Sequence, residues 1–384
     1  MRRARSSGVP LAPDAAPEAP AEPPAAPNVP EEEPQGTRLE ITGRNVAAII
    51  AFLALCLVAL YVLLPQVAGL DDTWGLIEDG NPYWIALGLV FTAGSFGGYV
   101  ALFRGVFLRK RGGHAAIGWR ESYQITMAGL AATRLFAAGG AGGIVLTAWA
   151  LRKSGMNRRE VADGSISFLS LTYGVYMSAL VIFGWGLHAQ ILPGEDPWAF
   201  TAVPAFIGMV AIAVAAGIAL TPTDLQRRLE DIACRPRGRI GRWGQKLANV
   251  PASASAGIRD AVSHLGSRDP ALLGAIAFWG FQIATLWAAF HAFGDAPPVG
   301  VLVMGFFVGM FGNLLPMPGG VGGVEGGMIA SFAAFGVDAG LALVAVLVYR
   351  AFAFWLPTIP GAVAYFQLRR TVERWSGELQ HAPT

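Results

Sequence analysis

Long runs of apolar residues dominate the chain and predict helices that cross a membrane. A helix needs about 20 mostly apolar residues to span the roughly 30 Å hydrocarbon core of a bilayer. Runs of this length occur at residues 46–66, 82–103, 161–187, 198–220, 270–293 and 341–366. Two further apolar stretches, at 117–151 and 300–336, are interrupted by glycines. The pattern predicts an all-α integral membrane protein with about six transmembrane helices and two irregular stretches.

Basic residues alternate with the apolar runs and predict the orientation of the chain. All but two of the 28 Lys and Arg residues lie before 46, at 104–120, at 152–160, at 221–269 or after 366. The connections 67–81, 188–197, 294–299 and 337–340 carry acidic residues and no Lys or Arg. Cytoplasmic loops of membrane proteins are enriched in Lys and Arg. We therefore expect a multi-pass protein of the inner (cytoplasmic) membrane with both termini in the cytoplasm.

Each interrupted stretch begins and ends on the same predicted side, so each predicts a re-entrant helical hairpin. The second arm of the first stretch, 144–151, covers about 12 Å of helix, and that of the second, 324–336, covers roughly 20 Å. Both arms are too short to span a bilayer. Each half of the chain then holds two spans, a hairpin and a third span, with opposite membrane polarity. This order predicts an inverted-topology repeat, which is the layout of many secondary transporters.

Glycine-rich motifs mark the predicted tips of the two hairpins. The first consists of Gly139, Gly140, Gly142 and Gly143, and the second of Gly319, Gly320, Gly322 and Gly323. Broken helices of transporters meet near the midplane of the membrane, so these glycines are candidate substrate-binding residues. The alternative is that they only allow close helix packing, to which Gly94/Gly98 and Gly305/Gly309 are also suited.

Three charged residues lie at predicted membrane depth: Arg134, Glu325 and Arg350. An ionised group near the bilayer centre costs about 2.5–3.5 kcal/mol on insertion scales, so it normally faces a partner or a wet cavity. The arginines could hold an anionic headgroup, because guanidinium matches phosphate with a rigid fork of donors. The helix start at Glu325 would favour the same anion. The alternatives are that Arg350 pairs with Glu325, that the arginines cap carbonyls freed at the hairpin breaks, and that Glu325 is a proton site.

The composition of the chain indicates its domain organisation, and the absence of catalytic and metal-binding motifs excludes some classes of function. The chain is 54% apolar and only 14% charged, whereas a soluble domain carries roughly 25% charged residues. We expect a disordered Pro/Ala/Glu-rich tail over 1–45 and a cytoplasmic tail over 367–384. The membrane domain between them, 46–366, comprises half-repeats 46–187 and 198–366, with a basic cytoplasmic loop at 221–269. No P-loop, metal-ligand spacing or nucleophile motif is present, so we expect no enzyme, cofactor, metal or nucleic-acid partner.

The stretch from Asn313 through Pro316 to Glu325, NLLPMPGGVGGVE, resembles the second-half signature of the lysylphosphatidylglycerol synthetase-type transmembrane, or flippase-like, family. Tyr349-Arg350, followed by Phe-Trp-Leu-Pro and Gly361, resembles the closing span of that family. In the first half, Arg134 precedes the glycines, whereas the family often places an arginine after them. The resemblance extends loosely over 46–366, and we expect no aminoacyl-transferring domain.

The resemblance implies flippase-like translocation of an anionic phospholipid or lipid-linked headgroup rather than synthesis of the lipid. It adds Asn313 and Pro316 to the candidate substrate-binding residues. Two alternatives remain: a secondary transporter of a small anionic solute, and a non-transporting scaffold for a lipid- or glycan-modifying enzyme. The expected partners are therefore the bilayer and an anionic membrane lipid, with a further copy of the chain or a lipid-modifying enzyme as additional possibilities.

Overall fold

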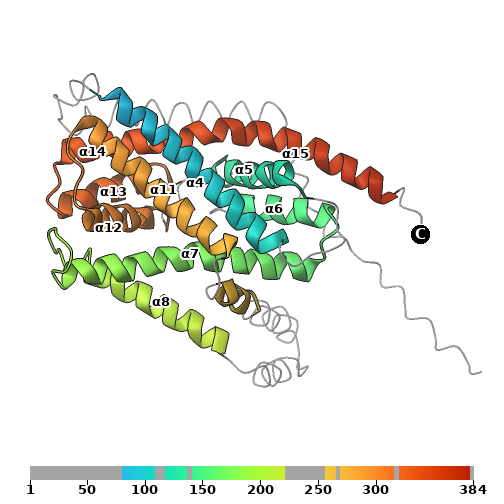
Figure 1. Cartoon of the computed structure of the whole chain (residues 1–384), viewed down its shortest axis with the longest axis horizontal. Coiled ribbons are helices and arrows are strands. Elements are labelled where there is room, and N and C mark those ends of the chain that lie inside the picture. Colours follow the sequence, from blue (N-terminus) through green and yellow to red (C-terminus); the bar gives the residue numbers. More distant parts are fainter. Residues whose placement is uncertain are drawn as a thin grey trace, which may run out of the picture. The chain divides into compact units, whose positions relative to one another are not determined.

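The computed structural model describes residues 80–108, 117–135, 141–220, 256–264, 269–314 and 320–380, all within one compact unit, 49–384. All the regular secondary structure of these residues is helical (Figure 1). The predicted tail 1–45, the first predicted span 46–66 and most of the basic loop 221–269 lie outside the described residues. The same holds for four of the candidate site residues, Gly139, Gly140, Pro316 and Gly319.

Five helical segments are long and apolar enough to cross a membrane, and they correspond to five of the six predicted spans. They are α4 (Pro82–Leu108), α7 (Arg158–His188), α8 (Ala202–Leu220), α11 (Pro270–Phe293) and the continuous segment Ala339–Trp375. The prediction of an all-α, multi-pass membrane protein is therefore confirmed.

The last span contains one π-helical turn. Helix α14 (Ala339–Arg350) leads into η4 (Ala351–Trp355) and then into α15 (Leu356–Gln380), past the predicted end of the span at 366. Within the turn, the N–H of Leu356 donates to the carbonyl of Ala351. Pro357 has no N–H to donate to the carbonyl of Ala353, so a regular helix cannot continue unchanged here.

Each interrupted stretch folds into short helices that pack against each other. Hairpin one consists of α5 (Trp119–Leu135) and α6 (Ala141–Lys153). Hairpin two consists of α12 (Val299–Gly309), η2 (Met310–Leu314) and α13 (Gly323–Ala334). Helices α6 and α13 have 13 and 12 residues, which is roughly 18–20 Å of helix and less than a bilayer core. That the hairpins are re-entrant stays a prediction.

The helices of the two halves pack in an exchanged pattern. Helix α4 lies along α11 (Figure 1), while hairpin one packs on α15 and hairpin two on α7. Gly98 brings α4 close to α11, since a Cβ there would lie 2.7 Å from the backbone nitrogen of Phe278. The last span of each half thus contacts the hairpin of the other half, and hairpin two also packs on α14 of its own half. The inverted-topology repeat stays a prediction.

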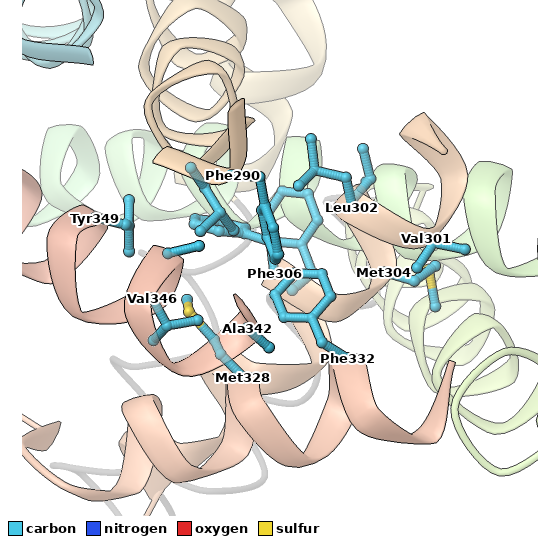
Figure 2. Packing of buried hydrophobic residues seen from close by; sticks show 14 of the residues in the cluster. Phe290, Val301, Leu302, Met304, Phe306, Met328, Phe332, Ala342, Val346 and Tyr349 are labelled. Atoms are coloured by element: carbon cyan, nitrogen blue, oxygen red, sulfur yellow. The ribbon is translucent and has the colours of Figure 1, made fainter. Parts of the chain in front are cut away.

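Buried apolar side chains form two clusters, one around each hairpin. The cluster around hairpin two joins α7, α11, α12, α13 and α14, and Figure 2 shows Phe290, Phe306 and Phe332 gathered within it. The other cluster joins hairpin one to α4, α7, α11 and α15. Close packing of this kind holds side chains in single rotamers. Each hairpin is therefore held in place by helices from both halves of the chain.

Candidate functional site

Arg134 and Arg350 flank the ring of Phe354, in the π-helical turn of the last span, and Glu325 pairs with Arg350. Arg134 lies in the last turn of α5, Glu325 in the first turn of α13, and Arg350 at the end of α14. The guanidinium carbons of Arg350 and Arg134 lie 4.2 and 5.0 Å from the centroid of the Phe354 ring. Cations at such distances from a ring centroid are attracted by its quadrupole. The structure thus brings together the three charged residues predicted at membrane depth.

Glu325 serves both the start of its own helix and Arg350. Its Oε1 accepts from Nε of Arg350 at 2.6 Å, and its Oε2 accepts from the backbone N–H of Gly322 at 2.8 Å. The two side chains are almost completely buried, with exposed fractions of 1% for Glu325 and 6% for Arg350. The ion pair that the sequence left as an alternative is present. The sequence suggested that this helix start could bind an external anion. In the structure the carboxylate of Glu325 itself occupies that position.

Arg134 donates to backbone carbonyls of the opposite half of the chain. Its two terminal nitrogens donate to Phe354 O at 2.7 Å and to Ala353 O at 2.9 Å. Thr358 Oγ1 lies 3.4 Å from the first of them. Ala353 is the residue whose carbonyl loses its usual helical donor at Pro357. Arg134 therefore does cap carbonyls, but those of the last span rather than those of a hairpin break.

The charges of this site do not balance. Two guanidinium groups flank Phe354, and Glu325 is the carboxylate that pairs with one of them. Among the described residues, no carboxylate pairs with Arg134, whose acceptors are neutral oxygens. A buried charge without a counterion is costly, so it favours an ion of opposite sign. The charge of Arg134 would therefore attract a negative group.

A small cavity lies between hairpin one, α4 and α7, and the sequence did not predict it. It has a volume of about 80 Å³, and its mostly apolar lining includes aromatic rings, such as that of Tyr99, and a few hydroxyl groups. Thr126, Thr133 and Ser165 each donate their hydroxyl hydrogen to the carbonyl four residues earlier. The oxygen lone pairs of these hydroxyls remain available as acceptors. The cavity can therefore accept hydrogen bonds from a polar headgroup.

Two of the described tip glycines, Gly143 and Gly323, pack against the backbone of their own hairpin. A Cβ on Gly143 would collide with the carbonyl of Gly129, and Gly323 packs on the backbone of Gly312 in the same way. Gly320 and Gly322 have φ values of +67° and +85°, where side chains with a Cβ are strained. The packing alternative thus describes the contacts of Gly143 and Gly323, and the substrate-binding role of the tip glycines stays a prediction.

The remaining candidates lie at the two turns rather than around Phe354. The amide of Asn313 is exposed, donates to the sulfur of Met310 and stands against Gly320. Gly142, partly buried, follows Ala141 at the start of α6. Sequence reasoning missed Phe354, although its place three residues before Pro357, inside an apolar span, was an available signal of local irregularity.

Comparison with known proteins places the chain in a family. The family described as the lysylphosphatidylglycerol synthase TM region matches residues 46–361, which is most of the chain. A UPF0104 membrane protein of Methanothermobacter thermautotrophicus is 32% identical over 90 residues. That match covers 23% of this chain and 26% of the relative, so the chain spans about a quarter of the length of that protein. The chain belongs to the lysylphosphatidylglycerol synthase transmembrane family.

Proposed function

We propose that this member of the lysylphosphatidylglycerol synthase transmembrane family translocates an anionic phospholipid or lipid-linked headgroup across the cytoplasmic membrane. The observation that carries the proposal is the excess positive charge at Arg134, which no carboxylate among the described residues neutralises. An ionised side chain at membrane depth suggests a functional site where the charge has a partner. We propose that the partner of Arg134 is the phosphate of the lipid.

In this proposal Arg134 stabilises the phosphate while the headgroup passes the middle of the membrane. A guanidinium has five N–H donors, and the contacts with Ala353 O, Phe354 O and Thr358 Oγ1 leave donors over. The hydroxyl groups in the wall of the small cavity beside hairpin one would bind the polar part of the headgroup. Translocation by this route forms and breaks no covalent bond, and the acyl chains stay in the lipid phase.

The orientation of the protein belongs to the same proposal. In this proposal both termini and the connection before hairpin one lie in the cytoplasm, and the basic connections between the spans support this orientation. Hairpin one then approaches Phe354 from the cytoplasmic side and hairpin two from the opposite side. The site would lie between the two and be reached alternately from each, as in transporters with inverted repeats.

The decisive experiment separates the structural role of Arg134 from its role toward the lipid. Arg134→Ala removes the donor to Ala353 O. Leaving a buried acceptor without its donor lowers the free energy of unfolding by about 1–3 kcal/mol. Pro357→Ala supplies a backbone N–H that can bond the same carbonyl. We therefore expect Arg134→Ala to lose both stability and lipid translocation, and the double variant to regain stability without regaining translocation.

The measurement uses purified protein in vesicles that contain fluorescent phosphatidylglycerol, with the rate at which label becomes accessible in the other leaflet as readout. Thermal unfolding in detergent reports stability, and Arg159→Ala, at an exposed cytoplasmic-side position, is the matched control. A double variant that translocates lipid at the wild-type rate would overturn the proposal. Flux of a small soluble anion without lipid movement would instead favour the secondary-transporter alternative. Arg350→Ala is a poorer first test because it leaves Glu325 buried without its cation.

A further inference from the structure

An apolar groove runs along the outside of the bundle between α4, α5 and α15. Its volume is about 590 Å³, and its lining is almost wholly apolar, with Thr92 and the ring hydroxyl of Tyr123 as polar exceptions. On the α4 side, Gly97 is exposed, and a Cβ added there would meet no atom within 4 Å. Leu356 and Ile359 of α15 are exposed at the groove as well. The groove is therefore open along its length.

The length of the groove matches one leaflet of a bilayer. It follows α4 from Leu89 to Val100, which is about 16 Å at the rise of a helix. Half of a roughly 30 Å hydrocarbon core is about 15 Å. The end at Val100 is the one nearer the basic connection 104–120, which is predicted to be cytoplasmic. An acyl chain of the predicted cytoplasmic leaflet has the length and polarity to fill this groove.

Positively charged side chains lie near the Val100 end of the groove. The guanidinium carbon of Arg104 lies 4.2 Å from the ring centroid of Trp119, a lining residue that is 65% exposed. Arg104 also donates to Ser122 Oγ at 3.2 Å, so it is held in position beside the groove. With Arg120 exposed next to Trp119, two arginines outnumber the neighbouring Glu121. A phosphate that lies at the membrane surface would find a cation there.

The deeper part of the groove adjoins the charged site. Phe96 lines the groove, and the guanidinium carbon of Arg134 lies 5.9 Å from the centroid of its ring. Pro357, which frees the carbonyl that Arg134 caps, lines the same groove. The acyl chain of a lipid bound in the groove would therefore lie against Phe96, on the other side of which is Arg134.

We propose that the groove holds one acyl chain of an anionic phospholipid of the cytoplasmic leaflet, with its phosphate beside Arg104 and Trp119. This inference rests on the proposed function and adds to it the place where the lipid waits before its headgroup reaches Arg134. The groove supplies apolar surface for the chain, and Arg104 selects anionic over zwitterionic headgroups.

The test fills the groove without disturbing the packing of the protein. Gly97→Leu places a side chain in open space on α4, and Gly280→Leu, on the exposed side of α11 where a Cβ also meets nothing, is the matched control. The probe is phosphatidylglycerol with a photoreactive group near the end of one acyl chain, in vesicles with and without excess phosphatidylcholine. Labelled peptides are identified by mass spectrometry, and translocation is measured on the same vesicles.

We expect labelling of groove peptides to fall about tenfold in Gly97→Leu and to stay at the wild-type level in Gly280→Leu. Arg104→Gln should lower the preference for phosphatidylglycerol over phosphatidylcholine several-fold while the groove stays open. Unchanged labelling in Gly97→Leu would overturn the proposal. A photoreactive amino acid introduced at position 359 would also overturn it if it cross-linked to residues 46–66 of the chain instead of to lipid. If the protein translocates no lipid but its groove is labelled, and Gly97→Leu abolishes that labelling, the acyl-chain site is supported and the proposed function is wrong.

Discussion

The two hairpins have the same plan but opposite electrostatics. Hairpin two brings Glu325, whose carboxylate caps its own helix and neutralises Arg350. Hairpin one brings Arg134, whose partners are neutral carbonyl oxygens of the last span. A charged pair that is hydrogen-bonded on both sides is complete, whereas a lone guanidinium held by carbonyls still attracts an anion. The comparison indicates that one hairpin stabilises the site and the other supplies a charge that no carboxylate of the described residues neutralises.

The surroundings of the hairpins differ in the same sense. Phe306, Met328 and Phe332 pack hairpin two into the larger apolar cluster (Figure 2). Hairpin one packs into the other apolar cluster, but Thr126 and Thr133 of this hairpin also line the small cavity. Dense packing resists movement, whereas a cavity with hydroxyl groups in its wall can admit water or part of a ligand. Under the proposed function, hairpin two is the fixed part and hairpin one is the part that meets the lipid.

The largest effect is expected when the carboxylate of hairpin two is removed. Glu325→Gln keeps the shape of the side chain but leaves Arg350 buried without a counterion, so we expect the free energy of unfolding to fall by about 3–5 kcal/mol. Unfolding of the purified protein in detergent measures it. As a control, Arg159→Gln breaks an ion pair with Asp163 in which the arginine is 82% exposed, for which under about 1 kcal/mol is expected. Equal losses in the two variants would contradict the assigned role of Glu325.

A smaller effect is expected from crowding the helix contacts within each hairpin. Gly143→Ala in hairpin one and Gly312→Ala in hairpin two both place a Cβ against backbone atoms of the facing helix. We expect each to cost about 1–3 kcal/mol, the usual range for overpacking. Gly174→Ala, at a helical site with open space, should be neutral or stabilising by about 0.5–1 kcal/mol. Sensitivity of one hairpin alone, in the same unfolding assay, would show that the two are not equally close-packed.

The smallest effect concerns a hydrogen bond between the last span and α11. The hydroxyl of Tyr349 donates to Gln282 Oε1 at 2.9 Å, and both residues are buried. Hydrogen bonds between membrane helices are worth about 0.6 kcal/mol on average. Tyr349→Phe should therefore lower stability by about that amount and leave lipid translocation near the wild-type rate. Tyr173→Phe, at an exposed ring, is the control, and loss of translocation in Tyr349→Phe would place the hydroxyl in the transport path.

The helices of the described part could be predicted because hydropathy is a local property. The runs at 82–103, 161–187 and 270–293 became α4, α7 and α11 with shifts of a few residues at their ends. The short arms of both hairpins followed from their glycines and their length. The π-helical turn was not predicted, although Pro357 was visible, because a proline alone does not say how the helix around it adjusts.

The site could be predicted only in part. The rarity of ionised residues in membrane spans singled out Arg134, Glu325 and Arg350 without any structure. The sequence left their partners open among headgroup, ion pair and carbonyl caps. The ion pair joins residues 25 positions apart, and the capped carbonyls lie 219 and 220 positions from Arg134. The spacing of residues along the chain does not determine contacts between separate helices.

The sequence by itself determined that this chain is a bundle of membrane helices with two glycine-broken hairpins and a few charges at membrane depth. These features depend on composition within windows of about 20 residues, where the bilayer acts on each segment separately. Only the tertiary structure decided that Glu325 neutralises Arg350 while Arg134 meets the carbonyls beside Pro357. Arg134 and its acceptors come from helices of opposite halves, and Glu325 and Arg350 come from separate helices of the second half. The rotation and crossing of packed helices determine which of these side chains meet.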